Sequence, residues 1–408
     1  MEQHLYCTID ITFEPGGSLG NRGRSGTVKL MPFDSTGQTA TMYSSQCLKN
    51  ALRSSTAYQS FIMSLGDEVA TKTKRAHLPV MFEKHVQEYL DSNQPVTNTS
   101  LVGKTALETA TSICNFLFKA KTKPTNKKGA TAEEEAENPT MSAQIYLLTP
   151  DEVRQCVSFA LNPQSMDALE LDAKEIEAEL SSRFNKTNLA SMLDKAIMGR
   201  FLATANGAGS LNVMSAVQYN AAVALEPLRH VSQMWTAVDD HTLDGGFANS
   251  GDEVLVFGWH HYTVSVDLTA IQELLSTFED VNVVATMRQF LEILCTTLPT
   301  RSPAKGNCEL IMSAMSLHRG QAYSSVSLAK DVHSSIRRVY QEVASQDYVA
   351  DFGVSMHEKC KKFGTGHEYI GHVGFGSTRS EDTLGMNSVS DMVGKMLDKA
   401  FAVNAERV

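Results

Sequence analysis

The chain has 408 residues, of which 42% are hydrophobic and 20% are charged, and its formal net charge is −10. This composition is typical of a soluble globular protein, and the length predicts about two or three lobes. No apolar run approaches the roughly 20 residues of a membrane-spanning helix, and the N-terminus lacks a secretory signal, so we expect a cytoplasmic protein. The seven cysteines stand singly, without C-x-x-C spacing, which argues against a disulfide framework and a cysteine-rich zinc site.

The first predicted element is a strand over residues 4–14. Apolar side chains occupy alternate positions there, at Leu5, Cys7, Ile9, Ile11 and Phe13. This alternation predicts a strand with one buried face. Glycines follow, and residues 18–43 show no sustained period. We expect a long loop or hairpin in that stretch, and long loops often carry function.

A helix is predicted to begin next, with Ser44 or Ser45 as its N-cap. Its buried stripe comprises Cys47, Leu48, Ala51 and Leu52. The opposite face carries Gln46, Lys49 and Arg53, which are spaced three and four residues apart. Residues 15–53 hold five basic residues and one acidic residue, Asp34, although the whole chain is acidic. Such local charge, rather than the net charge, decides whether a surface contacts nucleic acid.

Helical patterns dominate from about residue 60 to residue 200. One amphipathic helix is marked by Leu107, Ala110, Ile113 and Leu117. Another begins at Thr149-Pro150-Asp151-Glu152, which combines an N-cap, a proline in the first turn and a glutamate three residues after the cap. Residues 119–140 contain a run of lysines followed by glutamates and few apolar groups, which is typical of a flexible, solvated insert.

Strand patterns return after residue 250. Alternating apolar residues predict strands around Val254–Val266 and Leu310–Ala314, separated by a helix near Ala270–Phe278. An amphipathic helix is predicted over the C-terminal segment from Val389 to Phe401. Strands at both ends of the chain and helices in the middle predict an α+β fold with a large helical insertion.

Histidine and cysteine residues give weak support to a metal site. His260 and His261 are neighbours in a strand pattern, so they point to opposite faces and a structural role is favoured. The spacing of Cys360, His367 and His372 is irregular for zinc.

Aspartates give the best case for catalysis. Asp239 and Asp240 are adjacent, and Asp34 lies in the long loop before the helix at Ser44. Such carboxylates bind Mg²⁺ in enzymes that cleave phosphodiesters, but no third ligand is evident here. The phosphate-binding loops of nucleotide enzymes are also absent from the sequence.

The helix at Ser44 favours binding of a nucleic-acid backbone. A helix N-terminus presents unpaired N–H groups and a positive dipole end to a phosphate. Lys49 and Arg53 follow one and two turns later, and such a patch holds a backbone without reading bases. A solvated helix face has the same pattern. Trp235 lies in a polar stretch, where both stacking on a base and burial as an anchor are compatible with the sequence.

Three blocks of sequence together resemble the CasC-type backbone subunit of a type I-E CRISPR Cascade complex. The first block is Asn21-Arg22, the basic stretch to Lys29, and Ser44–Arg53, which is similar to the family pattern S-S-Q-x-L-K-x-A-x-R. The second block is Gly199-Arg200-Phe201. The third block runs from Trp235 to Asp240 and leads through a glycine-rich turn into the strand over 253–267.

This resemblance implies a right-hand-like architecture. The palm is an RRM-like (ferredoxin-like) domain, and it carries helical fingers as an insertion and a thumb hairpin. The implied boundaries are palm 1–60, fingers 61–200, palm return 201–229, thumb 230–252 and palm 253–408.

The resemblance also implies the function of a non-catalytic CRISPR RNA-binding subunit without a cofactor. Copies of the chain oligomerise along the guide RNA and present its spacer for pairing with target DNA. The implied partners are the guide RNA, target DNA through the guide, further copies of the chain and other Cascade subunits, with no membrane.

The residues that match the family motifs have implied roles. Those expected to hold the guide backbone are Arg22, Lys29, Ser45, Gln46, Lys49 and Arg53. Arg200 is expected at the palm, and Phe201 and Trp235 are expected to flank a displaced nucleotide. Two features depart from the family pattern: Asn50 stands where a second basic residue is common, and the insert at 119–140 is longer.

Two other functions stay open from the sequence. One is a guide-directed ribonuclease that uses Asp34 or the Asp239/Asp240 pair with Mg²⁺. The other is an assembly scaffold without RNA, in which the basic helix face packs against acidic neighbours.

Overall fold

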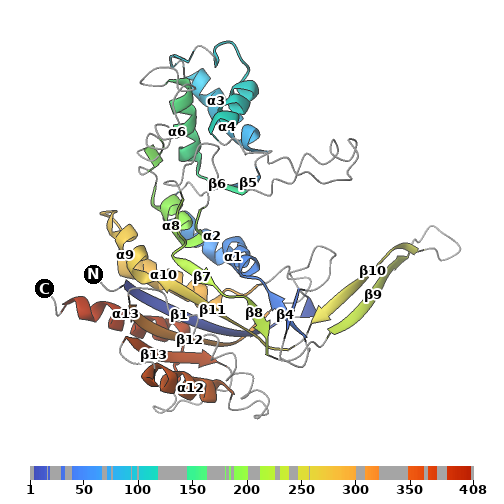
Figure 1. Ribbon diagram of the computed structural model, residues 1–408, viewed down its shortest axis with the longest axis vertical. Coiled ribbons are helices and arrows are strands. Elements are labelled where there is room, and N and C mark those ends of the chain that lie inside the picture. Colours follow the sequence, from blue (N-terminus) through green and yellow to red (C-terminus); the bar gives the residue numbers. More distant parts are fainter. Residues whose placement is uncertain are drawn as a thin grey trace. The chain divides into compact units, whose positions relative to one another are not determined.

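The computed structural model describes residues 4–15, 17–18, 29–32, 39–66, 71–74, 77–92, 94–98, 101–117, 145–162, 180, 183–184, 188–200, 212–225, 230–238, 247–256, 258–299, 308–320, 348–362, 366–374 and 384–405. The chain divides into two compact units, whose elements are labelled in Figure 1. The sheet unit comprises Met1–Phe61 and Ala216–Val408, and the helical unit comprises Ile62–Ser215. The helical unit begins beside the predicted start of the fingers and continues past their predicted end at residue 200.

An antiparallel sheet of eight strands forms the centre of the sheet unit. The strand order is β13-β12-β1-β11-β8-β4-β3, and β7 also pairs with β11. The strands are β1 (His4–Glu14), β3 (Leu30–Pro32), β4 (Thr39–Tyr43), β7 (Val217–Tyr219), β8 (Ala222–Ala224), β11 (His260–Asp267), β12 (Glu309–Gly320) and β13 (His367–Gly374). Together with the helices described below, this sheet confirms the predicted α+β fold class.

The first strand lies inside the sheet, between β11 and β12. The predicted strand is confirmed, but the prediction that only one of its faces is buried is wrong. Cys7 and Ile9 are buried on the face that packs against α9 (Leu268–Ser276) and α10 (Val283–Thr296). Thr8 and Asp10 on the other face are only 5% and 2% exposed. Helix α12 (Tyr348–Lys362) covers that second face. The pattern of apolar residues in β1 alone does not reveal this cover.

Hydrogen bonds among polar side chains make this second burial possible. Thr263 donates from Oγ1 to Oδ1 of Asp10 at 2.8 Å, and Nε2 of His261 lies 3.4 Å from the same oxygen. Thr12 Oγ1 lies 3.1 Å from Nδ1 of His261. Phe352 of α12 packs beside the ring of His261. Because these groups replace the hydrogen bonds that water otherwise provides, the alternating polar residues of β1 do not have to face solvent.

A second, smaller sheet in the sheet unit consists of three strands in the order β2-β10-β9. Its main part is the hairpin of β9 (His230–Val238) and β10 (Phe247–Val256), drawn in Figure 1 as an arm apart from the eight-stranded sheet. The short β2 (Gly17–Ser18) pairs only with Leu255 and Val256 at the base of the hairpin. The hairpin corresponds to the segment where a thumb is expected from the sequence.

The helical unit has its own core. Its helices are α3 (Leu78–Asp91), α4 (Ala106–Leu117), α6 (Pro150–Leu161) and α8 (Leu189–Met198), and its strands β5 (Thr71–Lys74) and β6 (Ile145–Leu148) form a two-stranded sheet. Helix α2 (Thr56–Ser64) spans the boundary between the two units. The predicted stripe of α4 is confirmed at Ala110, Ile113 and Leu117, but Leu107 is 44% exposed. Leu107 lies in the first turn of α4 and, among the described residues, does not belong to the core cluster of this unit.

The C-terminal helix α13 (Val389–Ala405) is buried along one stripe, as predicted. Its buried side chains are Met392, Val393, Met396, Leu397 and Ala400. It packs against α10 and against β12 and β13. Over the ranges that the structure describes, no helix has both the length and the apolar character to span a membrane.

Candidate nucleic-acid interface

The helix α1 (Ser45–Ser54) begins at Ser44, as the sequence predicts. Ser44 has extended backbone angles, and its Oγ accepts a hydrogen bond from the N–H of Cys47 at 3.4 Å. Leu48 and Leu52 are 3% and 1% exposed and fix α1 on the sheet unit. The helix itself provides no acceptor for the N–H groups of Ser45 and Gln46, which belong to its first turn. These N–H groups and the helix dipole favour an anion at this end of α1.

The other face of α1 carries its two cations. Gln46 is exposed, and Lys49 and Arg53 are half-buried. The helix contains no acidic residue. Its solvent-facing surface is therefore positive in a chain whose net charge is −10. Positive charge of this local kind attracts a phosphate backbone even when the whole protein is acidic.

Lys29 joins this surface from another part of the chain. Its carbonyl oxygen accepts a hydrogen bond from the N–H of Met42 in β4, at 3.0 Å. Burial raises the pKa of Cys47 in the first turn of α1, and the charge of Lys29 partly opposes that rise. The structure therefore brings Lys29 close to the start of α1, which lies 16 residues later in the sequence.

Burial also acts on Lys49. It lowers the pKa of this lysine to about 8, because a partly desolvated ammonium group is less stable in its charged form. A phosphate beside Lys49 offsets this desolvation, since an opposite charge favours the protonated form. The lysine is thus suited to an anionic partner.

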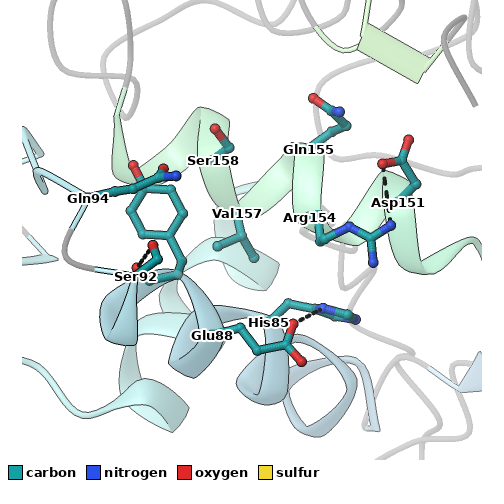
Figure 2. A pocket seen from close by; sticks show the side chains of 10 residues that line it. His85, Glu88, Ser92, Gln94, Asp151, Arg154, Gln155, Val157 and Ser158 are labelled. Carbon is teal, nitrogen blue, oxygen red and sulfur yellow. Dashed lines mark hydrogen bonds and ion pairs between the residues drawn. The ribbon is translucent and has the colours of Figure 1, made fainter.

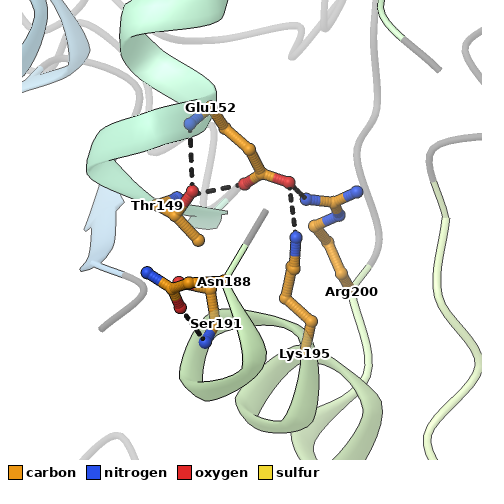
Figure 3. Close-up of polar contacts among 6 residues, drawn as sticks. All are labelled: Thr149, Glu152, Asn188, Ser191, Lys195 and Arg200. Carbon is orange, nitrogen blue, oxygen red and sulfur yellow. Dashed lines mark hydrogen bonds and ion pairs between the residues drawn. The ribbon is translucent and has the colours of Figure 1, made fainter. Parts of the chain in front are cut away.

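Arg200 is placed in the interior of the helical unit. Its Nη1 lies 2.6 Å from Oε1 of Glu152, and Nζ of Lys195 lies 2.7 Å from the same oxygen (Figure 3). All three side chains are buried. Burial alone raises the pKa of Glu152, but the charges of Arg200 and Lys195 outweigh burial and hold the pKa below its ordinary value. The guanidinium of Arg200 is therefore part of a buried ion-pair cluster in the helical unit.

The same glutamate confirms the predicted capping box at the start of α6. The N–H of Glu152 donates to Oγ1 of Thr149 at 3.0 Å, and the N–H of Thr149 donates to Oε2 of Glu152 at 3.0 Å. Oε2 of Glu152 thus accepts the capping hydrogen bond, whereas Oε1 forms the ion pairs with Lys195 and Arg200 (Figure 3). The sequence pattern reveals the capping box, but the ion pairs depend on tertiary packing.

Several candidate residues lie outside the described part of the chain. These are Arg22, Phe201, Asp34, Asp239 and Asp240. For Trp235 the structure gives the backbone position: it lies in β9, opposite Gly251 of β10. Gly251, a glycine, contributes no side chain of its own to this pair.

The adjacent residues His260 and His261 both pack within the core of the sheet unit. His260 packs against Phe13 and Tyr43 on one face of the sheet, and His261 contacts Phe352 on the other. Burial lowers the pKa of His260 to about 4, and its Nε2 lies 2.8 Å from Oγ1 of Thr41. This confirms the prediction that the two imidazoles point to opposite faces. Among the side chains that the structure describes, no group of three or more His, Cys, Asp or Glu residues is arranged to hold a metal ion.

A polar groove in the helical unit was not predicted from the sequence. It has a volume of about 340 Å³ and lies between α3 and α6 (Figure 2). Nδ1 of His85 lies 2.9 Å from Oε2 of Glu88 on the same helix, α3, and Asp151 and Arg154 on α6 form an ion pair at 3.5 Å. The spacing of three residues within each pair was visible in the sequence. That the two pairs line one groove depends on the packing of α3 on α6.

The profile of the CT1975-like protein family matches residues 13–368. One similar solved chain, from a "CRISPR RNA-guided surveillance complex, pre-nicking", is 17% identical, with a TM-score of 0.66 over 97% of this chain and 100% of that chain. Another, from a "CRISPR RNA-guided surveillance complex", is 15% identical, with a TM-score of 0.57 over 97% and 99%. No curated protein matches the chain.

Proposed function

Because the chain belongs to the CT1975-like protein family, we propose that it is a guide-RNA-binding subunit of a Cascade-type CRISPR surveillance complex. The observation that carries the proposal is the extent of the structural similarity. The similarity extends over both units, because 97% of this chain aligns with 100% of a chain from such a complex. In finer terms, we propose the non-catalytic backbone subunit of a type I-E complex, in which copies of the chain line up along one guide RNA.

The order of strands supports an RRM-like palm. In chain order, β1, α1, β8, β11, α10 and β12 follow the β-α-β-β-α-β arrangement. In space, the corresponding strands lie in the order β12-β1-β11-β8. On this proposal the sheet unit is the palm, the helical unit forms the fingers and the β9–β10 hairpin is the thumb.

The surface at the start of α1 holds the guide backbone in this proposal. Phosphates bind the N–H groups and side chains of Ser45 and Gln46, and the charges of Lys29, Lys49 and Arg53 neutralise them. None of these groups distinguishes one base from another. Sequence recognition is therefore left to base pairing between the guide and its target.

The hairpin supplies the aromatic contact. Trp235 stacks on a nucleotide in this proposal, because an indole binds any base by its face. The glycine opposite Trp235 is compatible with this role, because it brings no side chain of its own to the pair.

A double substitution on α1 tests the proposal. We expect Lys49→Ala with Arg53→Ala to weaken binding of guide RNA at least about tenfold, since two phosphate contacts are lost. The slope of log affinity against log salt concentration should shrink by about 0.7 for each lost contact. Fluorescence anisotropy over a series of salt concentrations measures both quantities.

Lys361→Ala with Lys362→Ala is the matched control, because it removes two exposed lysines from α12 in the same unit. We expect this control to bind like the unsubstituted chain. If the α1 variant keeps the original affinity and salt slope, the surface does not contact RNA and the assembly scaffold becomes the better account. Cleavage of RNA paired to the guide in the presence of Mg²⁺ would instead favour the ribonuclease.

A further inference from the structure

His260 is buried at the point where the β9–β10 hairpin joins the eight-stranded sheet. It is the first residue of β11, and it pairs with Ala224, the last residue of β8. The chain enters the hairpin after β8 and leaves it before β11, and the N–H of Leu225 donates to the carbonyl oxygen of Trp259 at 2.8 Å across this junction. We call the two facing segments, Ala224–Leu225 and Gly258–His260, the hairpin root.

Both ring nitrogens of His260 have a defined partner. Nδ1 lies 3.0 Å from the carbonyl oxygen of Gly258, which can only accept, so Nδ1 carries the proton. Burial lowers the pKa of His260 to about 4, so the ring is neutral near pH 7 and its Nε2 is an acceptor. Oγ1 of Thr41, 2.8 Å away, therefore donates to Nε2. The ring thus binds a carbonyl of the hairpin root with one nitrogen and a hydroxyl of β4 with the other.

The ring of His260 crosses β8 to reach β4. β8 lies between β11 and β4, and Ala224 is its residue opposite His260. The register of β4 and β8 pairs Met42 with Val223, which places Thr41 opposite Ala224 on the other side. The small side chain of Ala224 leaves room for the imidazole, and His260, Ala224 and Thr41 are 0%, 3% and 1% exposed. One side chain therefore joins three neighbouring strands.

Thr41 lies three residues before the start of α1. Tyr43, on the same face of β4, packs edge-on against His260 with ring centroids 5.3 Å apart. Ser44 follows directly and caps α1. His260 therefore contacts the strand that leads into α1, where phosphates are proposed to bind, and also the root of the hairpin, which is proposed to stack on a nucleotide.

We propose that His260 is a positioning residue for the guide RNA, because it fixes the root of the hairpin to the strand that leads into α1. The inference rests on the proposed function, in which both elements contact one RNA. It adds that the spacing between these two contacts is set inside the protein before RNA binds. A site whose parts are already held in place does not have to be ordered by its ligand, and this raises the affinity.

Two matched threonine substitutions test the link. Thr41→Val removes the hydroxyl that donates to His260, and Thr12→Val removes a buried hydroxyl next to His261 on the other face of the same sheet. We expect Thr41→Val to lower the affinity for a guide that holds one copy about tenfold, as the loss of one buried hydrogen bond implies. Thr12→Val and the conservative Thr41→Ser should stay within about twofold of the original affinity.

Substitution of the histidine itself completes the test. His260→Phe keeps a ring beside Phe13 and Tyr43 but removes both hydrogen bonds. We expect it to lower the affinity at least as far as Thr41→Val does. Adding Thr41→Val to His260→Phe should cause no further loss, because both substitutions remove the same link. Circular dichroism identifies a temperature at which every variant is folded, and affinities are compared there.

Two further readouts separate positioning from a loss of stability. The salt slope of Thr41→Val should equal that of the original chain, because α1 keeps its phosphate contacts. The chain has two tryptophans, so in a Trp259→Phe background the emission comes from Trp235. Quenching of this emission by bound guide should weaken with Thr41→Val and not with Thr12→Val.

The possible results distinguish the inference from the proposed function. Equal affinities of Thr41→Val and Thr12→Val, unchanged quenching of Trp235 in Thr41→Val, or a smaller salt slope in that variant overturns the inference, while RNA binding stands. A further loss when Thr41→Val is added to His260→Phe also overturns it. Failure of the unsubstituted chain to bind the one-copy guide overturns the proposed function, and the inference falls with it.

Discussion

Lys49 connects the fold to the proposed function at the scale of one residue. It lies on α1 between the buried stripe and solvent, and burial lowers its pKa to about 8. A lysine in solution is fully charged up to a much higher pH. The charge of Lys49 therefore changes near pH 8, well below the pKa of an exposed lysine.

This pKa predicts how RNA binding depends on pH. The protonated form binds phosphate, so the affinity is full below about pH 8 and decreases as the pH rises through that value. From about pH 7 to about pH 9 we expect a loss of about tenfold at constant ionic strength. Lys49→Arg should remove the dependence, because an arginine stays charged. A Lys49→Arg variant that follows the original pH curve would show that Lys49 is not the titrating group.

At the scale of elements, the sequence predicts what depends on local periodicity. The start of α1 at Ser44, the capping box at Thr149 and the C-terminal helix are all confirmed because cap residues and apolar spacing act within a few turns. The prediction that β1 is buried on one face only was wrong because α12, more than 300 residues away, covers its polar face. The interior position of Arg200 was missed for the same reason, since its partner Glu152 lies on α6, 48 residues away in the sequence.

The ion pairs of Glu152 connect α6 with α8 and with Arg200, so their removal should lower the stability of the protein. Glu152 holds the first turn of α6 and accepts hydrogen bonds from Lys195 of α8 and from Arg200. We expect Glu152→Ala to lower the free energy of unfolding by about 3–5 kcal/mol, because two buried cations lose their partner. Urea denaturation followed by circular dichroism measures the loss. Glu358→Ala removes an exposed partner of Lys362 on α12 and should change stability by less than about 1 kcal/mol.

At the scale of the whole molecule, the sequence predicts an α+β fold interrupted by a helical insertion. In the structure, the two segments of the sheet unit come before and after the helical unit in the sequence. The candidate RNA surface was predictable in part. Helix α1 of this surface follows from a local sequence pattern, whereas the approach of Lys29 to α1 depends on tertiary packing. The groove between α3 and α6 depends on tertiary packing in the same way. The family match over residues 13–368 includes residues of both units.

The most direct test of the central claim is the number of copies that one guide RNA holds. Native mass spectrometry of the chain purified with guides of increasing length gives this number. The proposed function predicts that copies are added in regular steps as the guide lengthens, and that the α1 variant of Lys49 and Arg53 forms shorter arrays. A chain that stays free of RNA, or that binds one copy whatever the length of the guide, would contradict it.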